Sequence, residues 1–245
     1  MTAAVVGGGA PPRLDMGKTV NSTLKVLLAR SLDLLVIGLP FVFLPNALVE
    51  LLPPDLRVFR LAAGLPSLIF IGAGSLLAYR EMTGGPRVGI GEAISAGARK
   101  FASLWGVGLI SNIGAALGLL LLIVPGVVLA SSLAAASSAV MVEGMTTTAA
   151  IDRAWRLSEG SRWRLAGLLA ITFLAIAVLL LLVGIAGAVL ALTLGPDTGV
   201  AVGQALVAPL YTVIMMALMT VGSTAVYVGL RQAREGAPGV ADVFV

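Results

Sequence analysis

The chain has 245 residues, of which 58% are hydrophobic and only 11% charged, and its mean hydropathy is +1.04. A soluble domain carries about 25% charged residues, so this chain cannot cover itself with polar surface, and lipid is its expected solvent. Its net charge of +4 comes from basic residues that lie between hydrophobic blocks, which argues against a nucleic-acid partner and for anionic lipid headgroups.

Long uncharged apolar blocks follow a short Gly- and Pro-containing tail at residues 1–15, which is expected to be flexible. The block at 103–142 has 40 residues, so a straight helix there would reach about 60 Å, twice the hydrocarbon thickness of roughly 30 Å. It must therefore fold back, and Pro125-Gly126 is the natural turn. The sequence predicts an all-α, polytopic membrane protein with one domain at 16–230 and a tail at 231–245. The six predicted spans lie at about 34–52, 61–79, 103–124, 127–142, 165–194 and 200–229.

Short proline-containing turns are expected to join these spans into three hairpins. They lie at Pro53-Pro54-Asp55, at Pro125-Gly126 and at Gly195-Pro196-Asp197. Of the 16 basic residues, only Arg57 and Arg60 lie on the side of these turns. Because basic loops stay in the cytoplasm, both termini are predicted to be cytoplasmic.

An amphipathic stretch precedes each hairpin, with apolar residues at helical spacing. A basic residue lies five positions after the first apolar one in each copy, which suggests a weak threefold repeat. Two interpretations remain open: helices lying flat at the inner interface, or extensions of the following spans. The stretches contain Val20, Leu24, Leu27 and Leu28; Ile94, Ala98, Phe101 and Trp105; and Ile151, Ala154, Trp155 and Ser158.

Basic and tryptophan side chains around these stretches are the candidate contacts to anionic lipids or to a membrane-protein partner, because such side chains anchor helices at the membrane surface. The candidates are Lys25, Arg99, Arg153, Arg156, Trp155, Arg162, Trp163 and Arg164.

Polar residues inside the spans need partners in hydrocarbon, so they should face the bundle interior or a wet cavity. They could line a solute pathway or form interhelical hydrogen bonds, and their lack of ionisable groups favours the second interpretation. The candidates are Asn46, Asn112, Ser131, Ser138 and Gln204.

Catalytic and metal chemistry has little support in the residues. The chain has neither cysteine nor histidine, which removes thiolate and imidazole ligands and the commonest general base. No nucleophile elbow, phosphate-binding loop or pair of carboxylates stands out. We therefore expect no enzyme activity, no catalytic residue, no metal and no cofactor.

Two segments carry a family resemblance: IVPGVVLASS at 123–132 and AAIDRAWRLSEGSRWRLAGLLAI at 149–171. Together they resemble bacterial YciC-like proteins and the membrane domain associated with some glycerophosphoryl diester phosphodiesterases. The resemblance implies a multi-pass protein of the bacterial cytoplasmic (inner) membrane. The phosphodiesterase chemistry of those relatives belongs to a separate barrel domain, so the resemblance implies no catalytic residue here.

Three hypotheses follow for the function. The first is a non-enzymatic inner-membrane protein that engages lipids or a membrane-protein partner, which could support envelope maintenance or protection. The alternative is a small transporter or carrier for an amphiphilic solute, with a cavity lined by Asn112, Gln204 and the serines of the fourth span. An enzyme acting on lipid headgroups is the third, and it would need carboxylates and serines converging at one interface.

Overall fold

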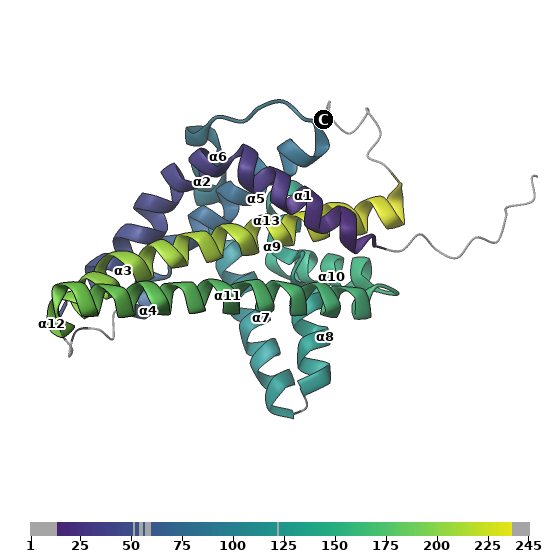
Figure 1. Ribbon diagram of the computed structural model, residues 1–245. Helices are drawn as coiled ribbons and strands as arrows, with labels where there is room; N and C mark the ends of the chain where they lie inside the picture. Colours follow the sequence, from purple (N-terminus) through teal and green to yellow (C-terminus); the bar gives the residue numbers. More distant parts are fainter. Residues whose placement is uncertain (1–13, 51, 54–55, 57–59, 122, 237–245) are drawn as a thin grey trace, which may run out of the picture.

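The computed structural model describes residues 14–50, 52–53, 56, 60–121 and 123–236, and this part of the chain is mostly helical and contains no strand (Figure 1). This confirms the all-α fold class. Four helical stretches among these residues are long and apolar enough to cross a membrane: Ser31–Glu50, Phe101–Gly118, Arg162–Leu194 and Pro196–Glu235. The six-span topology remains a prediction.

The N-terminal half begins with a capped helix, because the Asp15 carboxylate accepts a hydrogen bond from Lys18 N at 3.1 Å. The first predicted span consists of two α-helices on either side of a π-helical turn that contains Pro40. The segment predicted as the second span, from residue 61, contains the short α4 and then a long helix that begins after Pro66, which lacks a backbone N–H. The elements are α1 (Met16–Ala29), α2 (Ser31–Gly38), η1 (Leu39–Phe43), α3 (Leu44–Glu50), α4 (Arg60–Ala63), α5 (Ser67–Thr83) and α6 (Ile90–Arg99).

The C-terminal half folds back inside the 40-residue apolar block, because its two helices, α7 and α8, lie side by side (Figure 1). Residue 122 between them lies outside the described residues, and the predicted turn residues Pro125 and Gly126 fall within the helical stretch Ile123–Leu133. The elements are α7 (Phe101–Leu121), α8 (Ile123–Leu133), α9 (Ala136–Val142), α10 (Thr147–Ser158), α11 (Arg162–Leu194), α12 (Pro196–Val202), η3 (Gly203–Val207) and α13 (Ala208–Glu235).

The predicted tails have different outcomes. Residues 1–13 and 237–245 lie outside the described residues, as do parts of the first predicted outer turn, including Pro54, Asp55 and Arg57. Residues 231–235 of the predicted C-terminal tail form the end of α13, which continues to Glu235. The continuation is held by an ion pair within the helix, with Arg231 Nε 2.9 Å from Glu235 Oε2.

The first and third amphipathic stretches form helices that are separate from the spans after them, whereas the second is divided, with Ile94 and Ala98 on α6 and Phe101 and Trp105 on α7. Arg30 separates α1 from α2, Lys100 separates α6 from α7, and Glu159–Ser161 separate α10 from α11. Continuous extension of the following span is therefore not what the structure has. The face that α1 buries is also unexpected: Thr19, Thr23 and Val26 are buried, whereas Leu24 and Leu28 are 52% and 79% exposed.

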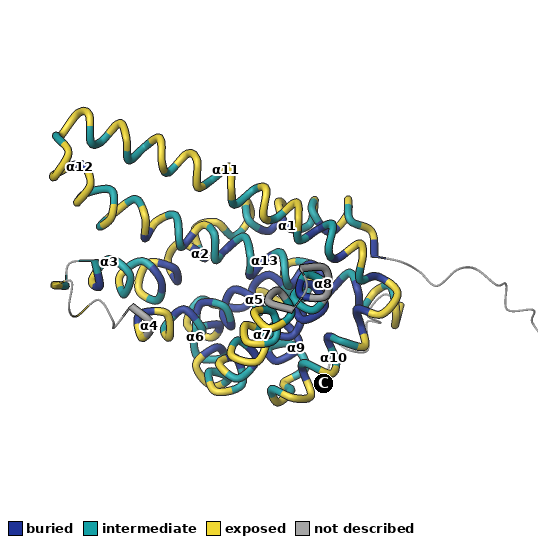
Figure 2. Tube along the Cα trace, turned by 90° about the horizontal axis from the view of Figure 1, so that it is seen from below, coloured by how far each residue is buried: buried dark blue, intermediate teal, exposed yellow. Residues whose placement is uncertain are grey.

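The helices diverge from a packed centre in two directions. In Figure 1 the α7–α8 hairpin points downward, across the direction of α11, α12 and α13, and Figure 2 views α7 and α8 nearly end-on. The three hairpins therefore do not form one parallel bundle in this structure. The centre is built around α5 and the second half of α13, where Phe70, Ala73 and Tyr227 have no exposed surface.

Close backbone approach at glycine holds this centre together. A Cβ added to Gly97 of α6 would lie 2.7 Å from Ile69 O of α5, and one added to Gly72 would lie 2.7 Å from Gly97 Cα. Small residues thus let α5 and α6 pack backbone against backbone, as is typical of membrane helices.

Candidate functional site

A polar cluster joins four helices at the end of the molecule where α10 and the C-terminal end of α13 meet. Arg153 of α10 donates to both carboxylate oxygens of Glu143, through Nε at 3.2 and 3.1 Å, and its Nη2 donates to Glu235 Oε1. Buried Tyr227 donates its hydroxyl to Glu143. Arg231 donates to Glu235 and, at 3.2 Å, to Tyr79 Oη of α5. We call these six residues the polar cluster.

The polar cluster balances two guanidinium groups against two carboxylates. Partial burial lowers the pKa of Arg153, but the hydrogen bonds that it donates to Glu143 and Glu235 raise it by more, so its net pKa lies above the ordinary value. Arg153 therefore stays charged and paired. Such a network orders the helices that supply it, since removing one partner leaves a partly buried charge unsatisfied.

This pairing involves one of the predicted contacts to lipid or a partner. The Arg153 guanidinium is held by two carboxylates, and its side chain is only 21% exposed. Arg156, three residues later, is on the exposed side of α10 and pairs only with Asp152, as the i, i+4 spacing predicts. The two arginines of this helix thus have different roles.

The start of α11 presents the remaining predicted contacts of this region. The Arg162 guanidinium carbon lies 4.0 Å from the centre of the Trp155 ring, a cation–π contact that fixes α10 against α11. Trp163 is 74% exposed. Arg164 is exposed and donates through Nη1 to Leu14 O at 2.8 Å, which ties the chain before α1 to α11.

The other two predicted basic contacts lie elsewhere on the surface. Lys25 is exposed on α1, and Arg99 is exposed at the end of α6, 3.4 Å from Ser95 Oγ through its Nη1. Both are free to meet headgroups, unlike Arg153.

The predicted intramembrane polar residues are scattered rather than gathered. Asn46 donates to Val42 O at 2.7 Å and Asn112 to Gly108 O at 2.8 Å, so each amide satisfies a carbonyl of its own helix. Asn112 and Gln204 are exposed, on α7 and η3. A cavity shared by Asn112, Gln204 and the serines is therefore not formed.

Ser138 behaves as the packing interpretation predicts. It is fully buried, and its Oγ lies 3.1 Å from Thr224 Oγ1, across the contact of α9 with α13. Thr224 also donates to Thr220 O, which leaves the Ser138 hydroxyl as the donor between the two. This bond links two helices inside the centre and does not line a pathway.

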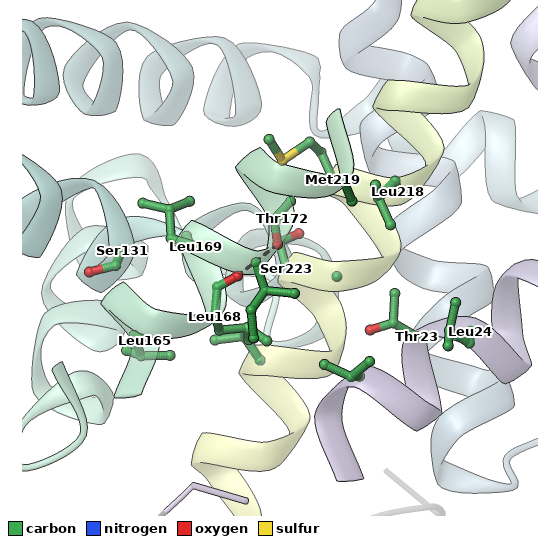
Figure 3. A pocket seen from close by; sticks show the side chains of 16 residues that line it. Thr23, Leu24, Ser131, Leu165, Leu168, Leu169, Thr172, Leu218, Met219 and Ser223 are labelled. Carbon is green, nitrogen blue, oxygen red and sulfur yellow. Dashed lines mark hydrogen bonds between the residues drawn. The ribbon is translucent and has the colours of Figure 1, made fainter. Parts of the chain in front are cut away.

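Ser131, another of the predicted polar residues, lines a cavity. The cavity has a volume of about 190 Å³ and lies between α1, α8, α11 and α13 (Figure 3). Leucine, isoleucine, valine, alanine and methionine side chains form most of its wall. Figure 3 shows Leu168, Leu169 and Thr172 of α11 facing Met219 and Ser223 of α13 across it.

Sequence reasoning missed both the polar cluster and this cavity. In the sequence, Tyr227 lies 84 residues from its partner Glu143, and Arg231 lies 152 residues from its partner Tyr79. Helical or strand spacing cannot predict contacts between residues so far apart in the chain. The small and hydroxyl residues Thr220–Thr224 of α13 were a usable signal, because such a run inside a span often marks a helix contact.

No family model matches the chain, and neither a curated protein nor a solved structure matches it. The resemblance to YciC-like proteins thus stays a prediction. Within the described part of the chain, no group of three or more carboxylate, histidine or cysteine side chains could hold a metal ion. The function is therefore argued from the helices, the polar cluster and the cavity.

Proposed function

We propose that this chain is a non-enzymatic integral membrane protein that binds anionic phospholipids at the interface formed by α10 and the start of α11. The observation that carries the proposal is the exposure of α11. This helix has 33 residues, of which only Leu165 and Leu168 are buried. Leucines such as Leu181 and Leu192, at 64% and 86% exposure, need a nonpolar surrounding, and lipid supplies it.

The length of α11 supports a tilted insertion. At 1.5 Å per residue its 33 residues extend about 50 Å, well beyond a hydrocarbon core of roughly 30 Å. A helix longer than the core tilts to bury its apolar surface. The divergence of the α11–α12 and α7–α8 hairpins fits two hairpins that are each tilted from the membrane normal (Figure 1).

The charges at the start of α11 support the choice of anionic lipid. Three arginines are adjacent in the sequence to two tryptophans: Arg156 follows Trp155, and Arg162 and Arg164 flank Trp163. Neither tryptophan is buried in the structure. Tryptophan favours the headgroup region, and each basic residue near an anionic surface contributes about 1 kcal/mol. We place this interface, both termini and the polar cluster at the cytoplasmic face of the inner membrane.

Transport of an amphiphilic solute has less support. It would need the intramembrane amides and serines to share one pathway, yet Asn112 and Gln204 face outward on separate helices. The hydrogen bonds of Ser138 to Thr224 and of the Asn112 side chain to Gly108 O are both made to groups of the protein itself.

Lipid retention tests the proposal. The full chain is reconstituted in vesicles of equal phosphatidylglycerol and phosphatidylcholine, extracted in mild detergent, and its bound lipids are quantified by mass spectrometry. We expect enrichment of phosphatidylglycerol that falls in the double variant Arg156→Gln, Arg162→Gln. Loss of two interfacial charges corresponds to about 2 kcal/mol, or roughly 30-fold in affinity.

A matched control removes two exposed charges elsewhere, Lys18→Gln and Arg87→Gln. An equal loss in both double variants would assign the preference to net charge and contradict a site at α10 and α11. Release of the wild-type chain from membranes by alkaline carbonate would refute the integral insertion.

A further inference from the structure

The cavity between α1, α8, α11 and α13 follows α11 through one leaflet. Its lining begins on α11 at Leu165, directly after the arginines and tryptophan of the interface, and ends at Ala175. That distance is about 15 Å along the helix, and because α11 is tilted its depth is less than half of the roughly 30 Å hydrocarbon core. The cavity therefore lies within the depth of one leaflet, where the tail of an inner-leaflet lipid lies.

The chemistry of the lining suits a hydrocarbon chain and little else. Its hydroxyl groups are already used: Thr23 donates to Thr19 O, Thr172 to Leu168 O and Ser223 to Thr220 O, each at 2.9 Å. Ser131, the fourth hydroxyl, is also engaged. Water needs two to four polar partners to settle in a cavity, and a dry cavity of this size takes apolar molecules instead.

Positive charge lies at the end of the cavity where α11 begins, because Arg164 immediately precedes the lining residue Leu165 and is exposed. Leu24 of α1 and the exposed Lys25 after it lie on the opposite side of the cavity (Figure 3). Leu24 itself is 52% exposed, so the cavity wall on α1 is continuous with the outer surface. An anionic headgroup outside the protein and an apolar tail inside it would meet complementary surroundings.

We infer that this cavity holds an acyl chain of an inner-leaflet anionic phospholipid, whose headgroup lies near Arg164. The inference rests on the proposed function, because the occupant comes from the bilayer around α11. It adds a specific site to a general interface: the lipid is held between helices and not only at the surface.

Gly222 offers a way to close this site without disturbing the fold. It lines the cavity, and a Cβ added there would meet nothing within 4 Å, so the larger side chain of Gly222→Leu would enter the empty volume. Ala175→Leu fills the same space from α11. Gly184→Leu is the matched control, since an added Cβ there also meets nothing and Gly184 does not line the cavity.

The experiment uses the full chain in vesicles that contain phosphatidylglycerol with a photoreactive diazirine on one acyl chain. After illumination, mass spectrometry locates the adducts. We expect adducts on cavity residues such as Met219 and Thr172, and a decrease of about tenfold in Gly222→Leu, because the added leucine competes for the volume that the chain fills. Ala175→Leu should give the same decrease, and Gly184→Leu should label like the wild type.

Labelling of the wild type confined to outward residues of α11, such as Leu181, would overturn the inference whether or not the variants fold. Unchanged cavity adducts in both filling variants would overturn it as well. In either case, phosphatidylglycerol enrichment that falls in Arg156→Gln, Arg162→Gln but not in the control double variant would leave the proposed function standing, so the two failures are distinguishable.

Discussion

Two apolar helices of this chain, α5 and α11, have opposite surroundings. Eight of the 17 residues of α5 are buried, whereas only two of the 33 residues of α11 are. Figure 2 shows the contrast, with α11 exposed along most of its length and α5 among other helices. Hydrophobicity alone therefore does not tell which apolar helix lies inside the protein.

The difference lies in residue size. Helix α5 contains the run Gly72-Ala73-Gly74-Ser75, and an added Cβ at Gly72 or Gly74 would press on Gly97 Cα or on the Thr220 side chain. Helix α11 has Gly184 and Gly187, but a Cβ at either would meet nothing within 4 Å. Small residues bring helices together where partners exist, and lipid covers α11 where partners are absent.

The largest expected effect comes from replacing one phenylalanine in each helix by alanine. Phe70 of α5 has no exposed surface, so Phe70→Ala should cost about 3–5 kcal/mol, from lost burial and from the cavity that it leaves. Phe173 of α11 is 57% exposed, so Phe173→Ala should change stability by only about 0.5 kcal/mol. The free energy of unfolding, measured by denaturant titration in detergent micelles, checks both. Equal losses would contradict the contrast between the two helices.

A second test adds one methyl group to a glycine. In Gly97→Ala the new Cβ would lie 2.7 Å from Ile69 O, so α5 and α6 must separate, at a cost of about 1–3 kcal/mol. Gly187→Ala on α11 has open space, and alanine favours helix over glycine by roughly 0.8–1.0 kcal/mol. We expect a lower melting temperature for the first variant and an unchanged or higher one for the second. A stable Gly97→Ala protein would show that the approach at Gly97 is not needed.

Much of the helical content could be predicted from composition, because uncharged blocks longer than a bilayer is thick must be helical and must turn. The start of α5 could not be placed by hydropathy, since Pro66 interrupts an otherwise uniform apolar block. The role of Arg153 could not be predicted either, because its partner Glu235 lies 82 residues away in the sequence. Local patterns indicate helices, whereas partners across helices depend on packing that one sequence does not display.

The smallest expected effect comes from comparing a buried polar residue, Ser138, with an exposed one, Asn112. Ser138 bonds to Thr224 across α9 and α13, and interhelical hydrogen bonds of this kind contribute about 0.6 kcal/mol on average and at most about 1.7. Ser138→Ala should therefore lower the free energy of unfolding by roughly that amount, because Thr224 keeps its bond to Thr220 O and is not left unsatisfied.

Asn112→Ala is the matched control for Ser138→Ala. Asn112 is exposed and bonds only within α7, to Gly108 O, so its removal should leave interhelical packing intact. Alanine also favours the helix over asparagine, and stability should be unchanged or slightly higher. Denaturant titration of both variants in the same micelles resolves the difference. If Asn112→Ala lowered the free energy of unfolding more than Ser138→Ala does, the Asn112 amide would have to lie at a helix contact. That result would favour the solute pathway again.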